Sequence, residues 1–175
     1  MKSKIADSLI KSLSHNMCTQ DYMTVINQGV ESYALDHINF TNYYNEISSR
    51  NRNHLVKNII YQDWLTHFSI LLQEQKIKVI ALKGIVLLDH IYTDPSKRTL
   101  GDIDLLVSIK DKNHVIFLLE SNGFIKTDEG KWYGNNFKLT LTRSYKEIQI
   151  AVEIHTKLFF NEEYINLSLI HISEP

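Results

Sequence analysis

The chain has 175 residues, with 19 basic and 20 acidic side chains and 43% hydrophobic content. That length suits one domain, or one domain with an appendage, and supplies enough apolar residues for a core. Only 6 glycines and 2 prolines occur, which excludes collagen-like, low-complexity and wholly disordered chains and favours a helix-rich protein. The near-zero net charge gives no global reason to expect a nucleic acid or an anionic membrane as partner.

The expected compartment follows from the lone cysteine and the apolar pattern. Cys18 cannot form an internal disulfide, and one cysteine makes no thiolate zinc site, so a reducing cytoplasm is the simplest setting. The first residues lack the apolar stretch of a signal peptide, and no segment approaches the roughly 20 apolar residues of a membrane span. We therefore expect a cytoplasmic protein without a membrane segment.

The first part of the chain, residues 1–76, is predicted to be helical. It contains no proline and a single glycine, Gly29, and its apolar residues recur at helical spacing. The clearest helix covers about residues 53–75, and the Asn- and Tyr-rich stretch 39–45 is expected to be a connection. The apolar face of that helix is predicted to comprise Val56, Ile60, Trp64, Phe68, Leu71 and Leu72.

The second part mixes strands and helices. An apolar run at 79–82 predicts a buried strand, and Pro95 marks a break after a short helix. Further elements are expected as strands at 102–107, 124–127, 138–142 and 147–156 and as helices at 85–92 and 112–121. Helices first and mixed strands later predict an α+β fold.

Two carboxylates lie together on one of these strands. Side chains alternate along a strand, so Asp102 and Asp104 are expected on one face. Such neighbours repel by about 1 kcal/mol in water-like surroundings, and more near a protein interior. A divalent cation would turn this repulsion into a binding site, since Mg²⁺ prefers carboxylate oxygens. The alternative is a strand end with two solvated aspartates.

The strand at 147–155 supplies a third carboxylate. Four apolar residues alternate with polar ones there, which places Glu153 and His155 on the polar face. Glu153 completes a three-carboxylate cluster if the two strands are neighbours, and is otherwise an ordinary solvent-facing glutamate. His155 is expected to orient Glu153, to touch substrate, or to lie exposed at the strand end.

Four motifs follow one another along the chain: Leu82-Lys83-Gly84, Tyr92-x-Asp94-Pro95, Arg98-x-x-Gly101-Asp102-Ile103-Asp104-Leu105-Leu106-Val107 and Val152-Glu153-Ile154-His155. In this order and spacing, they resemble the uncharacterised bacterial nucleotidyltransferase family of the polymerase-beta superfold. The resemblance spans about residues 55–160. It implies a core at 77–160, a mixed sheet with flanking helices, preceded by the helical region.

The resemblance also implies a site and a reaction. Asp102 and Asp104 would bind one or two Mg²⁺ ions, and Glu153 would ligate the catalytic metal and take a proton from the acceptor. An acceptor hydroxyl would then attack the α-phosphate of an NTP and release pyrophosphate. The acceptor, the NTP and the oligomeric state are not indicated by the sequence.

One departure from the superfamily concerns the turn after the first strand. The usual Gly-Ser is replaced by Lys83-Gly84, so the serine contact with phosphate is absent. Gly84 still permits close backbone approach, and Lys83 is either a charge for the triphosphate or a solvated loop lysine. Arg98 either contacts phosphate or pins the loop by pairing with Asp94.

The end of the sequence resembles something foreign to the protein. Residues 167–175 read like the translation of a sequencing-library adapter, so we expect the natural chain to continue past residue 166 in a different sequence. Residues 161–166 would then begin a missing C-terminal part, and the fold would be C-terminally truncated.

Two rival functions remain open at this point. One is a non-catalytic or antitoxin-like protein that binds a partner through the same fold. The other is a sugar-nucleotide glycosyltransferase that uses Asp-x-Asp with Mn²⁺. The second would need a nucleotide-binding α/β half upstream, which the helical first part does not supply.

Overall fold

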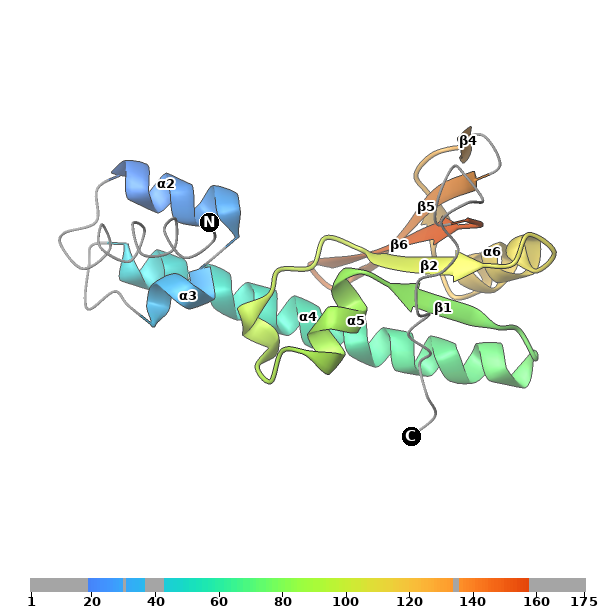
Figure 1. Ribbon diagram of the computed structural model, residues 1–175, viewed down its shortest axis with the longest axis horizontal. Helices are drawn as coiled ribbons and strands as arrows, with labels where there is room; N and C mark the ends of the chain where they lie inside the picture. The colour runs from blue at the N-terminus through green and yellow to red at the C-terminus, as the bar shows by residue number, and fades with distance from the viewer. Residues whose placement is uncertain (1–18, 30, 37–42, 134–135, 158–175) are drawn as a thin grey trace, which may run out of the picture. The chain divides into compact units, whose positions relative to one another are not determined.

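The computed structural model describes residues 19–29, 31–36, 43–133 and 136–157. The protein is α+β, as the sequence predicts, with helices and a six-stranded mixed sheet (Figure 1). The helices are α2 (Thr19–Gln28), α3 (Glu31–Leu35), α4 (Tyr44–Glu74), α5 (Gly84–His90), the 3-10 helix η1 (Pro95–Lys97) and α6 (Lys112–Ser121). The strands are β1 (Val79–Leu82), β2 (Ile103–Val107), β3 (Ile125–Lys126), β4 (Lys131–Tyr133), β5 (Asn136–Tyr145) and β6 (Ile148–His155). Within these ranges, no helix is both long and apolar enough to cross a membrane.

The chain divides into two compact units, each built from two stretches of sequence. The first unit takes residues 1–59 and 88–99, and the second takes 60–87 and 100–175. Both divisions fall inside helices, one in α4 and one in α5.

The first unit combines a small apolar cluster with buried polar contacts. Val25, Ala34 and Ile47 form the cluster. Beside it, Glu31 of α3 is buried, and its carboxylate lies 3.3 Å from His54 Nε2 and 3.6 Å from Arg50 Nε. Polar contacts therefore attach the first half of α4 to α3.

The loop after α5 is also held by polar groups of this unit. The side-chain amide of Asn58 donates hydrogen bonds of 2.6 Å to the carbonyls of Pro95 and Arg98. Asp94 caps η1 by accepting a 2.8 Å hydrogen bond from the backbone amide of Ser96, which lowers the pKa of Asp94. All of these contacts are between polar groups, so the hydropathy of the sequence does not reveal how this loop is held.

Two details of the predicted long helix are wrong. α4 begins at Tyr44, well before residue 53, and so includes part of the expected connection at 39–45, of which residues 39–42 lie outside the described residues. Its early turns contact buried Glu31 through the polar side chains of Arg50 and His54, although Ile47 packs into the apolar cluster. Trp64, Phe68 and Leu72 are buried as predicted, but Val56 is 48% exposed, and Tyr61, which was not predicted on this face, is buried.

The second unit is built on the sheet, whose strand order is β1-β2-β6-β5-β3, with β4 also paired to β5. β1 is antiparallel to β2, β2 is parallel to β6, and β6 is antiparallel to β5. Five strands occur where apolar runs or alternation predict them. β4 was not predicted, because three residues at the sheet edge carry no usable period.

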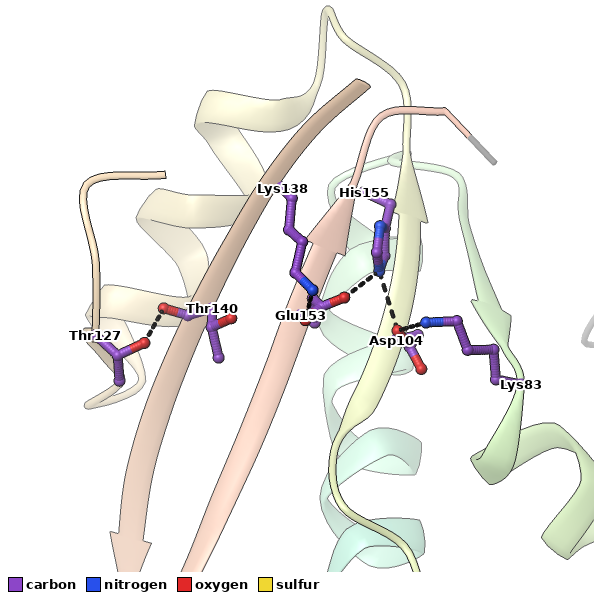
Figure 2. Close-up of polar contacts among 7 residues, drawn as sticks. All are labelled: Lys83, Asp104, Thr127, Lys138, Thr140, Glu153 and His155. Carbon is purple, nitrogen blue, oxygen red and sulfur yellow. Dashed lines mark hydrogen bonds and ion pairs between the residues drawn. The ribbon is translucent and has the colours of Figure 1, made fainter. Parts of the chain in front are cut away.

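The two faces of the sheet have different characters. One face is buried and consists of Ile103, Leu105, Val107, Leu139, Leu141, Ile150, Val152 and Ile154. α4 and α6 lie behind the sheet in Figure 2, and they contribute the buried residues Trp64, Phe68, Leu72, Val115, Leu118 and Leu119. The opposite face carries the polar side chains drawn in that view, so the alternation separates core from candidate site.

Tyr61 ties α4 to the strands that carry the carboxylates. Its ring is fully buried, and its hydroxyl lies 3.2 Å from the Gly101 carbonyl and 3.0 Å from the Gln149 carbonyl, either of which accepts its hydrogen. The same oxygen accepts a 3.3 Å hydrogen bond from the Ala151 amide. One hydroxyl thus joins the start of β2 to the start of β6.

We expect Tyr61→Phe to lower the free energy of unfolding by about 1–2 kcal/mol, because buried backbone groups lose a partner while the ring still fills its space. Urea unfolding followed by circular dichroism measures this loss. Tyr145→Phe, at a tyrosine that is 46% exposed, is the control and should change stability by less than about 0.5 kcal/mol. Equal effects of the two substitutions would contradict the role given to the Tyr61 hydroxyl.

Candidate active site

The candidate site starts from the pairing of β2 with β6. These strands are parallel neighbours, and their register sets Asp104 opposite Glu153. Adjacent strands lie about 4.8 Å apart, and residues in register project to the same face. The two carboxylates are therefore held side by side, although they lie far apart in the sequence.

His155 lies between these two carboxylates. Its Nε2 atom is 3.0 Å from Asp104 Oδ1 and 2.7 Å from Glu153 Oε1 (Figure 2). Both carboxylate side chains are more than 90% buried, and the imidazole is 12% exposed. One atom from each residue belongs to a group whose members all lie within 4.8 Å of one another, a spacing that suits a metal ion.

Two lysines approach the same carboxylates from either side. Lys83 Nζ lies 2.5 Å from Asp104 Oδ1, and Lys138 Nζ lies 2.6 Å from Glu153 Oε2. Figure 2 shows the row that results, in which Lys138, Glu153, His155, Asp104 and Lys83 follow one another across three strands and the turn after β1. The side chain of Lys83 is 61% exposed and that of Lys138 is 41% exposed, so both remain accessible to solvent.

Lys83 reaches Asp104 from an uncommon backbone conformation. It occupies the single position between β1 and α5 with φ of 55°, in the left-handed region that disfavours a residue with a β-carbon. Its carbonyl accepts a 3.1 Å hydrogen bond from the Leu87 amide, and Gly84 begins α5. The turn therefore directs the Lys83 side chain to the polar face of the sheet.

Asp102 lies just before β2, half-buried and outside the group of mutually close ligand atoms. Burial raises its pKa, and the charges of Asp104 and Glu153 raise it further, although Lys83 and Lys138 act in the opposite direction. It therefore belongs to the same electrostatic environment as the other two carboxylates.

The pKa of Asp104 shifts in the opposite direction. Burial alone would raise its pKa, but hydrogen bonds from His155 and Lys83 outweigh this effect and lower the pKa below its ordinary value. The two aspartates that the sequence treats as an equivalent pair are thus chemically different. Asp104 is held as an anion, whereas Asp102 resists ionisation.

Arg98 lies in the first unit. Its guanidinium sits over the ring of Tyr92 at 5.9 Å, and Asp94, one of its expected partners, accepts its hydrogen bond from Ser96 instead. A contact between Arg98 and phosphate stays a prediction.

The chain also matches a known protein family. A model of the family described as uncharacterised nucleotidyltransferase matches residues 23–171. The chain belongs to that family. No curated protein and no solved structure matches the chain.

For a member of this nucleotidyltransferase family, the donors at the site fit a divalent cation. Two buried carboxylates and an imidazole converge within coordination range, and basic groups offset their charge. Sequence reasoning overlooked Lys138, because its position next to Glu153 depends on the pairing of β5 with β6. It placed His155 on the correct face, but alternation does not show that the ring contacts both acids.

We expect neutralising Asp102 and Asp104 to change the stability of the metal-free protein in opposite directions. Asp102 has a native pKa above its unfolded value, so its ionisation costs stability as the pH rises through the native pKa, and Asp102→Asn should stabilise the protein at pH 7. Asp104 has a lowered native pKa, so its contribution is present above the unfolded pKa and is lost as the pH falls through the native one. Asp104→Asn should cost about 1.5 kcal/mol at pH 7.

Urea unfolding in the presence of a chelator, at pH 7 and at progressively lower pH, measures both changes. Both changes in the free energy of unfolding should become smaller at low pH, where the carboxylates are protonated. Shifts of the same sign at pH 7 would contradict the assignment of opposite pKa directions.

Proposed function

We propose that the protein transfers a nucleoside monophosphate from an NTP to an acceptor hydroxyl and releases pyrophosphate, on a polymerase-beta-like core. The observation that carries this proposal is the register of β2 and β6, which brings Asp104 and Glu153 to one buried point on the polar face of the sheet. Membership of a nucleotidyltransferase family supports the same reaction class.

The cofactor we propose is Mg²⁺, as one or two ions, held by Asp102, Asp104 and Glu153. When bound there, it would neutralise charge on the attacking and leaving oxygens of the phosphoryl transfer. Asp104 is suited to this task because its lowered pKa keeps it ionised. Asp102 is less readily ionised in the metal-free site, and a nearby cation would favour its charged form.

The chain's own groups account for the remaining steps. Glu153 would accept the proton of the acceptor hydroxyl while the hydroxyl oxygen bonds to the α-phosphorus. The bond from that phosphorus to the bridging oxygen then breaks, and pyrophosphate leaves with the electron pair. Lys83 and Lys138, whose ammonium groups border the carboxylates, would bind the triphosphate oxygens. Gly84 and Arg98 remain proposed phosphate contacts.

The partner-binding alternative explains less of the structure. A domain that only docks a partner gains nothing from holding two buried carboxylates side by side with Asp102 nearby, since their mutual repulsion costs stability. The rival glycosyltransferase needs an upstream α/β half, and the described part of the chain before β1 is helical.

We expect Glu153→Gln to abolish metal-dependent NTP binding, because the amide no longer carries the charge that holds the cation. Isothermal titration with each NTP, in Mg²⁺ and in chelator, measures the affinity. Glu147→Gln is a matched control, since Glu147 is exposed on the turn before β6. An unchanged metal-dependent affinity in Glu153→Gln would remove the basis for the proposal.

We expect Lys83→Met and Lys138→Met each to affect metal and nucleotide binding in opposite ways. Without nucleotide, loss of a competing ammonium group should tighten metal binding by about fivefold, corresponding to roughly 1 kcal/mol. With metal present, NTP affinity should fall by a similar factor, because a positive charge near the triphosphate is lost. Lys78→Met, at an exposed lysine before β1, should change neither affinity. Parallel changes in both affinities would indicate a merely structural role.

A further inference from the structure

His155 occupies a central position in the candidate site. The residue lies in β6, paired on one side with Leu106 of β2 and on the other with Lys138 of β5. A central strand with partners on both sides holds the imidazole more firmly than a loop would. The ring is 12% exposed, and its Nε2 atom points between two buried carboxylates.

The two separations between His155 Nε2 and the carboxylate oxygens match those of neighbouring ligands in a coordination shell. Two adjacent ligands of an octahedral ion, each about 2.1 Å from the metal, lie about 3 Å apart. His155 Nε2 lies 3.0 Å from the nearer Asp104 oxygen and 2.7 Å from the nearer Glu153 oxygen. One donor atom from each of the three residues lies within 4.8 Å of the others, a spacing that a single ion can bridge.

The chemistry of this set differs from that of an all-carboxylate site. Mg²⁺ is a hard ion that takes oxygen ligands, whereas imidazole nitrogen suits first-row transition metals. With its hydrogen on Nδ1, a neutral histidine directs the Nε2 lone pair at the ion. A donor set of two carboxylates and one imidazole leaves about three octahedral positions for triphosphate and acceptor oxygens.

We infer that His155 is itself a ligand, and that the site prefers a first-row transition-metal ion that accepts imidazole, with Mn²⁺ as its representative, over Mg²⁺. This inference rests on the proposed function, because it assumes that Asp104 and Glu153 bind the catalytic cation. It replaces the all-oxygen set of Asp102, Asp104 and Glu153 with Asp104, Glu153 and His155 as the inner ligands. Asp102 then acts on the ion through its charge, in keeping with its place outside the close group.

The competing explanation is that His155 only donates a hydrogen bond and orients the carboxylates. Both roles place Nε2 at the observed distances, so activity alone does not separate them. A spectroscopic test of direct bonding separates the two roles, because a coordinated imidazole nitrogen couples magnetically to Mn²⁺.

The test is electron spin-echo modulation spectroscopy of the untagged protein with bound Mn²⁺, with and without NTP. We expect nitrogen modulation in the unsubstituted protein that changes to the ¹⁵N pattern when histidine is ¹⁵N-labelled. His155→Gln should lose the modulation and reduce the preference for Mn²⁺ over Mg²⁺ by about tenfold or more in competition titrations. His114→Gln, at an exposed histidine on α6, should retain both.

The outcomes separate the two proposals. If Mn²⁺ binds and Glu153→Gln abolishes binding, yet the unsubstituted protein shows no histidine nitrogen modulation, His155 is not a ligand and the proposed function stands. If no divalent ion binds with or without NTP, both proposals fail. The spectrum of the unsubstituted protein decides the ligand question even if His155→Gln does not fold.

Discussion

The parallel pairing of β2 with β6 is the constraint on which the site depends. Its register sets Asp104 beside Glu153 on one face while Ile103 and Val152 meet on the other. A slip of one residue would turn either carboxylate into the apolar core. The burial of Ile103 and Val152 therefore fixes where the acids lie, and stability and site geometry are set by the same pairing.

Two buried carboxylates at this distance repel each other, and their surroundings compensate. His155 bridges them, Lys83 and Lys138 flank them, and the lowered pKa of Asp104 records the net effect. The metal-free site is thus stabilised by groups that a cation and a triphosphate would rearrange. Under the proposed function, the charges of Lys83 and Lys138 would couple metal binding to nucleotide binding.

Much of the fold and of the candidate site could be predicted from the sequence, because strand periodicity is a local property. Alternation predicted that Glu153 and His155 share one face of their strand, and Asp104 is paired in register with Glu153. α6 was predicted with its observed bounds, since its apolar period and its ending at Asn122-Gly123 lie within one short segment. The start of α4 escaped prediction because its partners there, including Glu31, are polar and distant in sequence.

The sequence by itself determined the α+β class, the polar and apolar faces of the strands, and the identity of the acids, because side-chain direction follows from the backbone period. Only the tertiary structure decided which strands are neighbours, since pairing across long separations depends on the summed burial of the whole sheet. The strand pairing gave Asp102 and Asp104 opposite pKa shifts and brought Lys138 to Glu153. It also set the His155 ring between two acids. Each of these facts concerns the distance between side chains on different strands, which a local pattern does not contain.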